Sequence, residues 1–286
     1  MISAVIVLYK STEEELCRVL TSVKSQVDKV YLVDNTPIPM NYKTQDANVE
    51  YTALGRNAGI AAAQNVGIKA ALEAGADYIL CSDQDSILPK GMVAEQLETF
   101  KKLRESGRKV ACIGVQAVDA TTGEPYPYVA NYIRNLNGEF THIAEVTQTM
   151  SSGSIYPASL FQEIGLLEEA LFIDGVDSEI CWRAKKVINA DSFVNENIKI
   201  KHSLGLGTKK AGLRSISITP PYRMYYMYRN YMWLCRRDYV PTKWKTYNGM
   251  KYLIKMFYYP LLKAPRMEYI MNICKGIKAG FSSQKQ

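Results

Sequence analysis

Short apolar runs alternate with longer stretches of helical period along the first part of the chain. Four runs have the continuous apolar pattern of strands that are buried on both faces, and they cover residues 4–8, 30–33, 78–81 and 110–115. Helices are expected between them, from Thr12 onward, over residues 58–74 and over about residues 92–103. Strands that alternate with helices pair in parallel through right-handed crossovers. The pattern therefore predicts an α/β fold with a mostly parallel central sheet and helices on both faces.

Polar residues follow directly after three of these strands, at Tyr9, Asp34 and Asp83. Ligands of such sheets bind beyond the carboxyl ends of the strands, so these positions are the first candidates for chemistry. None of the three turns contains the Gly-x-Gly-x-x-Gly of a dinucleotide fold or the Gly-Lys-Ser/Thr of a P-loop. This argues against a dehydrogenase and against an ATPase. The helix between the first two strands opens with Thr12 and Glu15 at the spacing of a capping box.

The segment Asp83-Gln84-Asp85 places two carboxylates at the mouth of the expected sheet. Hard divalent cations such as Mg²⁺ and Mn²⁺ prefer oxygen ligands, and they often use one or two carboxylates together with substrate phosphates. An Asp-x-Asp at this place could therefore hold a metal diphosphate. The alternative is a solvated turn, because this short pattern often arises by chance.

Several motifs follow one another in residues 1 to about 235, and their order is far more specific than any single motif. They are the opening Val5-Ile6-Val7-Leu8-Tyr9, then Val33-Asp34-Asn35, Gly55-Arg56-Asn57-Ala58-Gly59-Ile60 with Asn65-Val66-Gly67, Asp83-Gln84-Asp85-Ser86, Ser152-Gly153-Ser154, residues 171–179 with Arg183, and finally His202 and residues 226–230. In this order they resemble glycosyltransferase family 2, of the GT-A type of nucleotide-sugar-binding fold. Within it they are similar to the bacterial rhamnosyltransferases of O-antigen and capsule assembly.

The resemblance implies a donor site. Tyr9 and Asp34 would hold the nucleobase and ribose of a nucleotide sugar, and Arg56 or Asn57 would lie against the nucleotide at a helix N-terminus. Ser154 would lie near the sugars. From the residues alone, Tyr9 could equally pack against the next helix, Asp34 could open a turn and Asn57 could cap the helix.

A metal site and a catalytic base are also implied. Asp83 and Asp85 would bring Mg²⁺ or Mn²⁺ to the diphosphate, with His202 as a third ligand from a distant strand end. Asp177 aligns with the family's catalytic aspartate. The family usually has adjacent acids just ahead of that position, whereas Val176 precedes Asp177 here, so either Asp174 or Asp177 could be the base.

Glu179 would support the catalytic acids, and Arg183 is expected to pair with one of them. The structural alternative is that these acids only cap a helix, since acids in a first helical turn stabilise the helix dipole. The glutamine in the middle of Asp83-Gln84-Asp85 is common in the rhamnosyltransferase-like branch. It is the reason to favour a dTDP-rhamnose donor.

Charge is distributed very unevenly along the chain. Residues 199–286 contain 18 Lys or Arg and 2 acids, whereas the rest contains 17 basic and 26 acidic residues. Residues 220–265 alternate these cations with tyrosine, tryptophan and methionine, a composition typical of helices that lie in lipid headgroups. We expect Lys251, Lys255 and Lys263 to attract an anionic membrane at a distance from the donor site. The alternative is a pair of helices that only packs on the core.

The predicted domains are a catalytic domain over residues 1–203, with a donor-binding half to about 115 and an acceptor-binding half over about 116–203, and a basic helical region over 204–286. Six cysteines without metal-ligand spacing are expected to be reduced core thiols, and no apolar stretch is long enough to span a membrane. These features predict a cytoplasmic protein that is peripheral to the inner face of the cell membrane.

The predicted function is an inverting glycosyltransferase that moves a sugar, with L-rhamnose from dTDP-rhamnose the first choice, to a saccharide acceptor on a lipid carrier. The same mechanism with UDP-hexose or UDP-galactofuranose is the alternative. A non-catalytic binder of nucleotide sugar or of nucleic acid is the alternative of another class. Nucleic acid is not expected as a partner, because no recognised nucleic-acid module is present and the first part of the chain is acidic.

Overall fold

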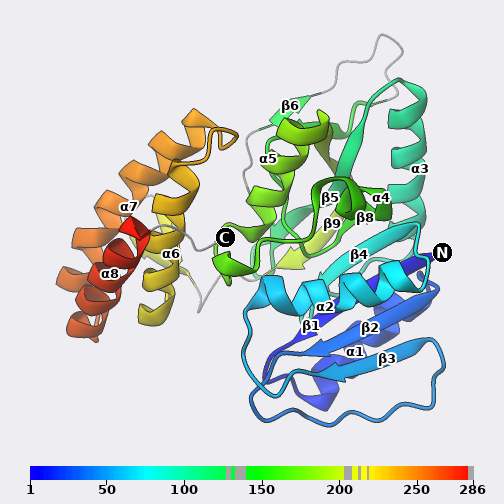
Figure 1. The fold of residues 1–286 in the computed structure, drawn as a ribbon, viewed down its shortest axis with the longest axis horizontal. Coiled ribbons are helices and arrows are strands. Elements are labelled where there is room, and N and C mark those ends of the chain that lie inside the picture. Colours follow the sequence, from blue (N-terminus) through cyan, green and yellow to red (C-terminus); the bar gives the residue numbers. More distant parts are fainter. Residues whose placement is uncertain (127–129, 133–139, 203–207, 212–213, 218, 283–286) are drawn as a thin grey trace.

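The computed structural model describes residues 1–126, 130–132, 140–202, 208–211, 214–217 and 219–282. Within these residues, nine strands form one sheet in the order β3-β2-β1-β4-β8-β5-β9-β7-β6, and two more form a separate hairpin (Figure 1). The sheet strands are β1 Ile2–Leu8, β2 Lys29–Asp34, β3 Val49–Ala53, β4 Tyr78–Asp83, β5 Val110–Asp119, β6 Ala130–Tyr132, β7 Ile143–Val146, β8 Ser154–Pro157 and β9 Asp191–His202. The hairpin pairs β10 Thr208–Ala211 with β11 Arg214–Ser217.

The helices follow the strands as the periodicity predicts in the first part of the chain. The helices of the α/β part are α1 Glu13–Lys24, α2 Ile60–Glu73, α3 Met92–Glu105, α4 Ala158–Ile164 and α5 Val176–Ile188, with a 3₁₀ turn at Glu169–Leu171 before α5. The capping box of α1 is confirmed, since the Glu15 N–H donates to Thr12 Oγ1 at 3.2 Å and the Thr12 N–H to the Glu15 carboxylate at 2.9 Å. The predicted α/β sheet with helices on both faces is also confirmed.

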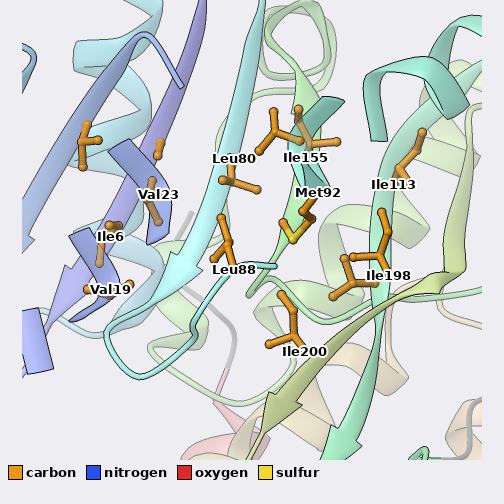
Figure 2. Close-up of a cluster of buried hydrophobic side chains, with 14 of the residues drawn as sticks. Ile6, Val19, Val23, Leu80, Leu88, Met92, Ile113, Ile155, Ile198 and Ile200 are labelled. Atoms are coloured by element: carbon orange, nitrogen blue, oxygen red, sulfur yellow. The ribbon is translucent and has the colours of Figure 1, made fainter. Parts of the chain in front are cut away.

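Successive residues of the central strands point to opposite faces of the sheet, so each face has its own core. Ile6 packs with α1 and α3, and the cluster on this face includes Leu80, Met92 and Ile113 (Figure 2). Val5, next to Ile6, packs on the other face with α2, α4 and α5. Continuous apolar strands are therefore explained by helices that cover both sides of the sheet.

The far half of the sheet is mixed rather than parallel. Among the described strands, β1–β2, β1–β4, β2–β3 and β5–β9 pair in parallel, whereas the pairs of β8 with β4 and β5, and of β7 with β6 and β9, are antiparallel. Strand β8 reaches its place from a turn at Gly153, which has a positive φ of 79°. The antiparallel β8 brings this turn to the carboxyl end of β4, where the site lies.

The predicted basic aromatic helices are α6 Pro221–Cys235, α7 Thr242–Leu262 and α8 Arg266–Phe281, and they gather beside the α/β part (Figure 1). Helix α8 approaches α6 closely at Gly276, where an added Cβ would lie 2.5 Å from the Tyr225 carbonyl oxygen. Tyr228, Tyr259 and Tyr269 are buried between the three helices. The predicted boundary near residue 203 falls on residues 203–207, outside the described part, so the division into domains stays a prediction.

The cysteines agree only in part with the expectation of core thiols. All six are free, but only Cys81, Cys112 and Cys181 are buried, while Cys17 and Cys274 are exposed. In the described part of the chain, no helix combines the length and the apolar character that a membrane span requires.

Candidate active site

The Asp83-Gln84-Asp85 turn lies at the carboxyl end of β4, beside the end of β1. Gln84 turns away from the acids and binds the backbone of Tyr9: its Oε1 accepts from the Tyr9 N–H at 2.6 Å and its Nε2 donates to the Tyr9 carbonyl at 3.3 Å. Asp83 is half-buried and Asp85 is exposed. The middle glutamine thus joins two strand ends and leaves the two carboxylates at the mouth of the sheet.

A serine turn at residues 151–153 connects this motif to α5. Ser152 Oγ accepts from the Asp83 N–H at 2.9 Å and donates to Ser86 Oγ at 2.8 Å. The Ser151 N–H donates to Asp177 Oδ2 at 3.1 Å. One short turn therefore fixes the Asp-x-Asp motif and the predicted base relative to each other, although they are far apart in the sequence.

Asp177 lies in the first turn of α5, and its side chain is half-buried. Desolvation, the largest effect, and then the negative charges of Asp83 and Asp174 raise the pKa of Asp177 to about 6, against the lowering effects of the Ser151 N–H and Arg223. A carboxylate whose pKa lies near working pH is suited to accept a proton from an acceptor hydroxyl.

Asp174 is engaged differently. Arg223, at the start of α6, binds both carboxylate oxygens of Asp174 through Nε and Nη2 at 2.8–3.1 Å. The Asp174 carbonyl oxygen also accepts from Asn230 of α6 at 2.7 Å. An arginine fork occupies both oxygens of Asp174, whereas Asp177 Oδ2 accepts the Ser151 N–H, so the contacts leave Asp177 less occupied than Asp174.

Glu179 has no exposed surface and is the centre of a buried charge network. Arg183 binds it at 2.9 and 3.0 Å, Arg237 at 3.2 Å, and the Tyr239 hydroxyl donates to it at 2.7 Å. The expected pairing of Arg183 with one of the acids is thus confirmed for Glu179. Glu179 is expected to support the catalytic acids, and this network is compatible with that role, because a fully buried carboxylate fixes α5 without contacting the acceptor.

Asp34 organises the loop after β2. Its carboxylate accepts from the Thr36 N–H at 3.0 Å, the Met40 N–H at 2.9 Å and the Tyr51 hydroxyl at 2.7 Å. Burial raises the pKa of Asp34, but these hydrogen bonds outweigh it and hold the pKa below its ordinary value. The turn-opening role of Asp34 is therefore present, and its contact with a nucleobase stays a prediction. Tyr9, by contrast, is 40% exposed and open to a ligand.

The segment before α2 is arranged around two asparagines. Asn57 Oδ1 accepts from Asn35 Nδ2 and from the Gly59 N–H, both at 3.1 Å, and Asn35 Oδ1 accepts from the Ala58 N–H at 2.7 Å. Arg56 is exposed. The N-cap of α2 is Gly59, so the alternative that Asn57 caps this helix is wrong. Asn57 instead forms a turn ahead of the helix, and the exposed Arg56 side chain is available to a nucleotide.

Ser154 and His202 are two predicted site residues whose side chains the structure does not place at the mouth of the sheet. Ser154 has no exposed surface, and its hydroxyl contacts Thr149 Oγ1 at 3.0 Å and the Met150 carbonyl. The expected contact of Ser154 with the sugars is thus not supported, because strand β8 turns this side chain into the core. His202 is the last residue of β9, as its pattern predicts, but its side chain lies outside what the structure describes.

Comparison with known proteins places the chain in a family. Residues 3–165 match the family described as glycosyl transferase family 2. The dTDP-rhamnosyl transferase RfbF of Shigella flexneri is 34% identical over 250 residues, 84% of this chain and 81% of that protein. The chain belongs to glycosyl transferase family 2. It is therefore a glycosyltransferase.

Solved structures support the fold of this glycosyltransferase. TarS of S. aureus (residues 1–349) in complex with UDP-GlcNAc has a TM-score of 0.56 at 17% identity, over 97% of this chain and 81% of that one. GalNAc-T7 with UDP, GalNAc and Mn²⁺ has a TM-score of 0.55 at 13% identity, over 91% of this chain and 57% of that one. At such identities the likeness shows the fold alone, and it confirms the predicted GT-A type.

The acids of this glycosyltransferase would bind a metal only together with the phosphates of the donor. No group of three or more His, Cys, Asp or Glu that could hold a metal occurs among the described residues. Asp83 and Asp85 nevertheless offer hard oxygen ligands at the strand end, with Gln84 turned aside. One or two carboxylates plus substrate phosphates are a usual set for Mg²⁺ or Mn²⁺, so the residues fit a cation that arrives with the donor.

Sequence reasoning missed the contribution of Arg223 in α6, although residues 226–230 of this helix are among the ordered motifs. Arg223 and Asn230 both contact the loop around Asp174, and Arg229 donates to the Ala170 and Leu171 carbonyls at 2.6 and 3.2 Å. The concentration of cations in residues 199–286 is the available signal for Arg223. In addition to the membrane contact expected of this region, helix α6 of this glycosyltransferase holds the loop that carries Asp174.

Proposed function

We propose that the chain is an inverting rhamnosyltransferase that uses dTDP-L-rhamnose. The relative of 34% identity that is named as a dTDP-rhamnosyl transferase is the observation that carries the donor. An O-antigen or capsule precursor is the proposed product. UDP-hexose and UDP-galactofuranose are the alternative donors.

The residues support a direct displacement. Asp177 would take the proton of an acceptor hydroxyl, whose oxygen would then attack the anomeric carbon from the face opposite the leaving group. The bond between that carbon and the diphosphate oxygen would break, and its electron pair would leave with the nucleoside diphosphate. Mg²⁺ or Mn²⁺ held by Asp83 and Asp85, with His202 as the third predicted ligand, would stabilise the leaving diphosphate as a Lewis acid. Tyr9 and Arg56 are the exposed candidates for donor contact.

The acceptor is proposed to be a saccharide on a lipid carrier, reached at the inner face of the cell membrane. Helix α7 supports this with exposed apolar side chains at helical spacing, namely Tyr247, Met250, Ile254, Phe257 and Leu261. Exposed lysines on the same helix group suit an anionic headgroup layer. Peripheral membrane binding therefore belongs to the proposed function.

The test is donor binding and transfer with a panel of nucleotide sugars. Thermal shift with Mg²⁺ or Mn²⁺ should show stabilisation by dTDP-rhamnose above that by UDP-hexoses, because a ligand that binds the folded state raises the unfolding midpoint. Asp85→Ala should weaken this binding and remove its dependence on metal. Glu105→Ala, which removes an exposed carboxylate from α3, is the matched control. Equal donor affinity of the parent with and without chelator would exclude the metal, and a preference for a UDP-hexose would exclude rhamnose.

A further inference from the structure

Asp174 is bound by one cation of the tail helices and lies within electrostatic reach of two more. Arg223 of α6 binds the Asp174 carboxylate directly, at 2.8 Å through Nη2. Lys251 and Lys255 lie one turn apart on α7, on the same side of that helix, and both interact electrostatically with Asp174. Lys255 also feels the charge of Arg223. The three cations therefore act on the same carboxylate, three residues before Asp177.

Helix packing holds this arrangement. The Tyr228 hydroxyl of α6 donates to the Tyr252 carbonyl of α7 at 2.6 Å, and the rings of Tyr231 and Tyr252 meet edge to face at 5.2 Å. Tyr252 lies between Lys251 and Lys255 in the sequence, so anchoring it to α6 fixes both lysines relative to Arg223. The cluster thus belongs to a packed interface and not to a loose surface.

The positive charge of the cluster exceeds the negative charge beside it. Among the described residues, neither Lys251 nor Lys255 forms an ion pair, and Asp174 is already bound by Arg223. Lys255 is half-buried, and its pKa is lowered to about 8, first by desolvation and then by Lys251 and Arg223. Lys251 is exposed, so the argument rests on Lys255, because a partly desolvated cation without an ion pair is unfavourable unless an anion binds there.

The position of the cluster indicates which anion this is. The donor diphosphate is assigned to Asp83 and Asp85, whereas the cluster lies by Asp174 on α6 and α7, which also present the exposed apolar side chains of α7. Arg223 binds Asp174 through Nε and Nη2, so its Nη1, together with the two lysine ammonium groups, offers donors to the oxygens of a phosphoryl group. We propose that Arg223, Lys251 and Lys255 form a phosphoanion site that holds the diphosphate linking the acceptor saccharide to its lipid. This rests on the proposed function, and it deepens it by locating the acceptor.

The experiment compares two acceptors that carry the same saccharide, one on a diphosphate lipid and one on a neutral alkyl chain. The double variant Lys251→Gln/Lys255→Gln should raise the KM for the diphosphate acceptor by about tenfold or more, the scale of one lost charge-assisted hydrogen bond. The KM for the neutral acceptor and for the donor should change far less. Lys275→Gln/Lys278→Gln, which removes two exposed lysines of α8, is the matched control.

Inorganic pyrophosphate with a chelator gives a second measurement that needs no transfer activity. Pyrophosphate should raise the unfolding midpoint of the parent and of the α8 control but not of the Lys251→Gln/Lys255→Gln variant, which separates this site from failure of the proposed donor. Equal KM changes for both acceptors, or a change in donor KM alone, would overturn the proposal. So would loss of binding to phosphatidylglycerol vesicles without a change in acceptor KM, because the cluster would then bind bulk lipid headgroups.

Discussion

At the scale of single residues, the site separates acids of similar sequence context by their surroundings. Desolvation and the nearby charges of Asp83 and Asp174 raise the pKa of Asp177. The Ser151 N–H and Arg223 lower this pKa in part. Asp174, three residues earlier, has the Arg223 fork to itself. Two acids whose environments differ in this way are suited to different tasks, one to proton transfer and one to fixing α6 against the loop before α5.

This difference predicts a pH dependence. Because the pKa of Asp177 is about 6, the base is protonated and inactive below that pH, and kcat/KM of the parent should rise with pH through about 6. Asp177→Asn should lower kcat by roughly a hundredfold or more and keep donor affinity. Its residual activity should lack the rise with pH, the acidic limb of the pH profile. The groups that face Asp177 and set the limb are Asp83, Asp174 and Arg223.

Asp174→Asn is the control for this assignment. It removes one negative charge beside Asp177, so it should retain measurable activity and shift the limb to lower pH. Pre-steady-state transfer rates at constant metal concentration, from pH 5 to 8, measure both variants. An inactive Asp174→Asn beside an active Asp177→Asn would move the base to Asp174.

At the scale of elements, the start of α2 depends on a close approach to the loop before α5. Gly59 has a φ of 88°, and an added Cβ would lie 2.6 Å from the Phe172 carbonyl oxygen, which accepts from the Ile60 N–H at 2.7 Å. Phe172 in turn stacks on Tyr226 of α6, with ring centroids 4.5 Å apart. The donor loop, the acid-bearing loop and the tail helices are thus linked through one backbone contact.

Substituting Gly59 by alanine should therefore destabilise the protein and disturb the site. Gly75→Ala is a matched control, since Gly75 has a similar φ of 80° but no atom near the added Cβ. The control should lose only the cost of the strained backbone, about 1 kcal/mol, whereas Gly59→Ala should lose several kcal/mol and some donor affinity. Denaturant unfolding measures the difference, and equal losses would show that Phe172 moves aside without cost.

The sequence predicts elements well where the signal is local and poorly where it depends on distant contacts. The strands and helices of residues 1–119 follow from apolar periodicity except for β3, an edge strand that is only partly buried and was not predicted. The Thr12 capping box is confirmed because it involves neighbouring residues only. The antiparallel insertion of β8 has no such local signal, and Ser154 was misjudged because its burial depends on that insertion. The pairing of Arg223 with Asp174 joins an α6 cation to an acid far away in the sequence, which no periodicity reveals.

At the scale of the whole molecule, the basic tail has two distinct faces. Lys251 and Lys255 interact electrostatically with Asp174, whereas their expected attraction to an anionic membrane at a distance from the donor site stays a prediction. The outer face of α7 instead carries apolar side chains that are 60–69% exposed, including Met250, Ile254 and Phe257. The membrane contact proposed for this glycosyltransferase is therefore better assigned to these apolar residues, with the cations between them and the catalytic acids.

This assignment predicts which substitutions release the protein from membranes. Ile254→Gln/Phe257→Gln should lower co-sedimentation with anionic vesicles and remove the part of binding that resists salt, because salt screens charges within about a Debye length but leaves apolar contacts intact. Ile38→Gln/Val187→Gln, which changes two exposed apolar residues of the α/β part, is the matched control and should bind as the parent does. Donor affinity should be unchanged in both, since neither pair contacts the Asp83 to Asp85 turn. If the parent is instead a dimer that Ile254→Gln/Phe257→Gln converts to a monomer, with vesicle binding unchanged, the outer face of α7 binds a second copy of the chain and not a membrane.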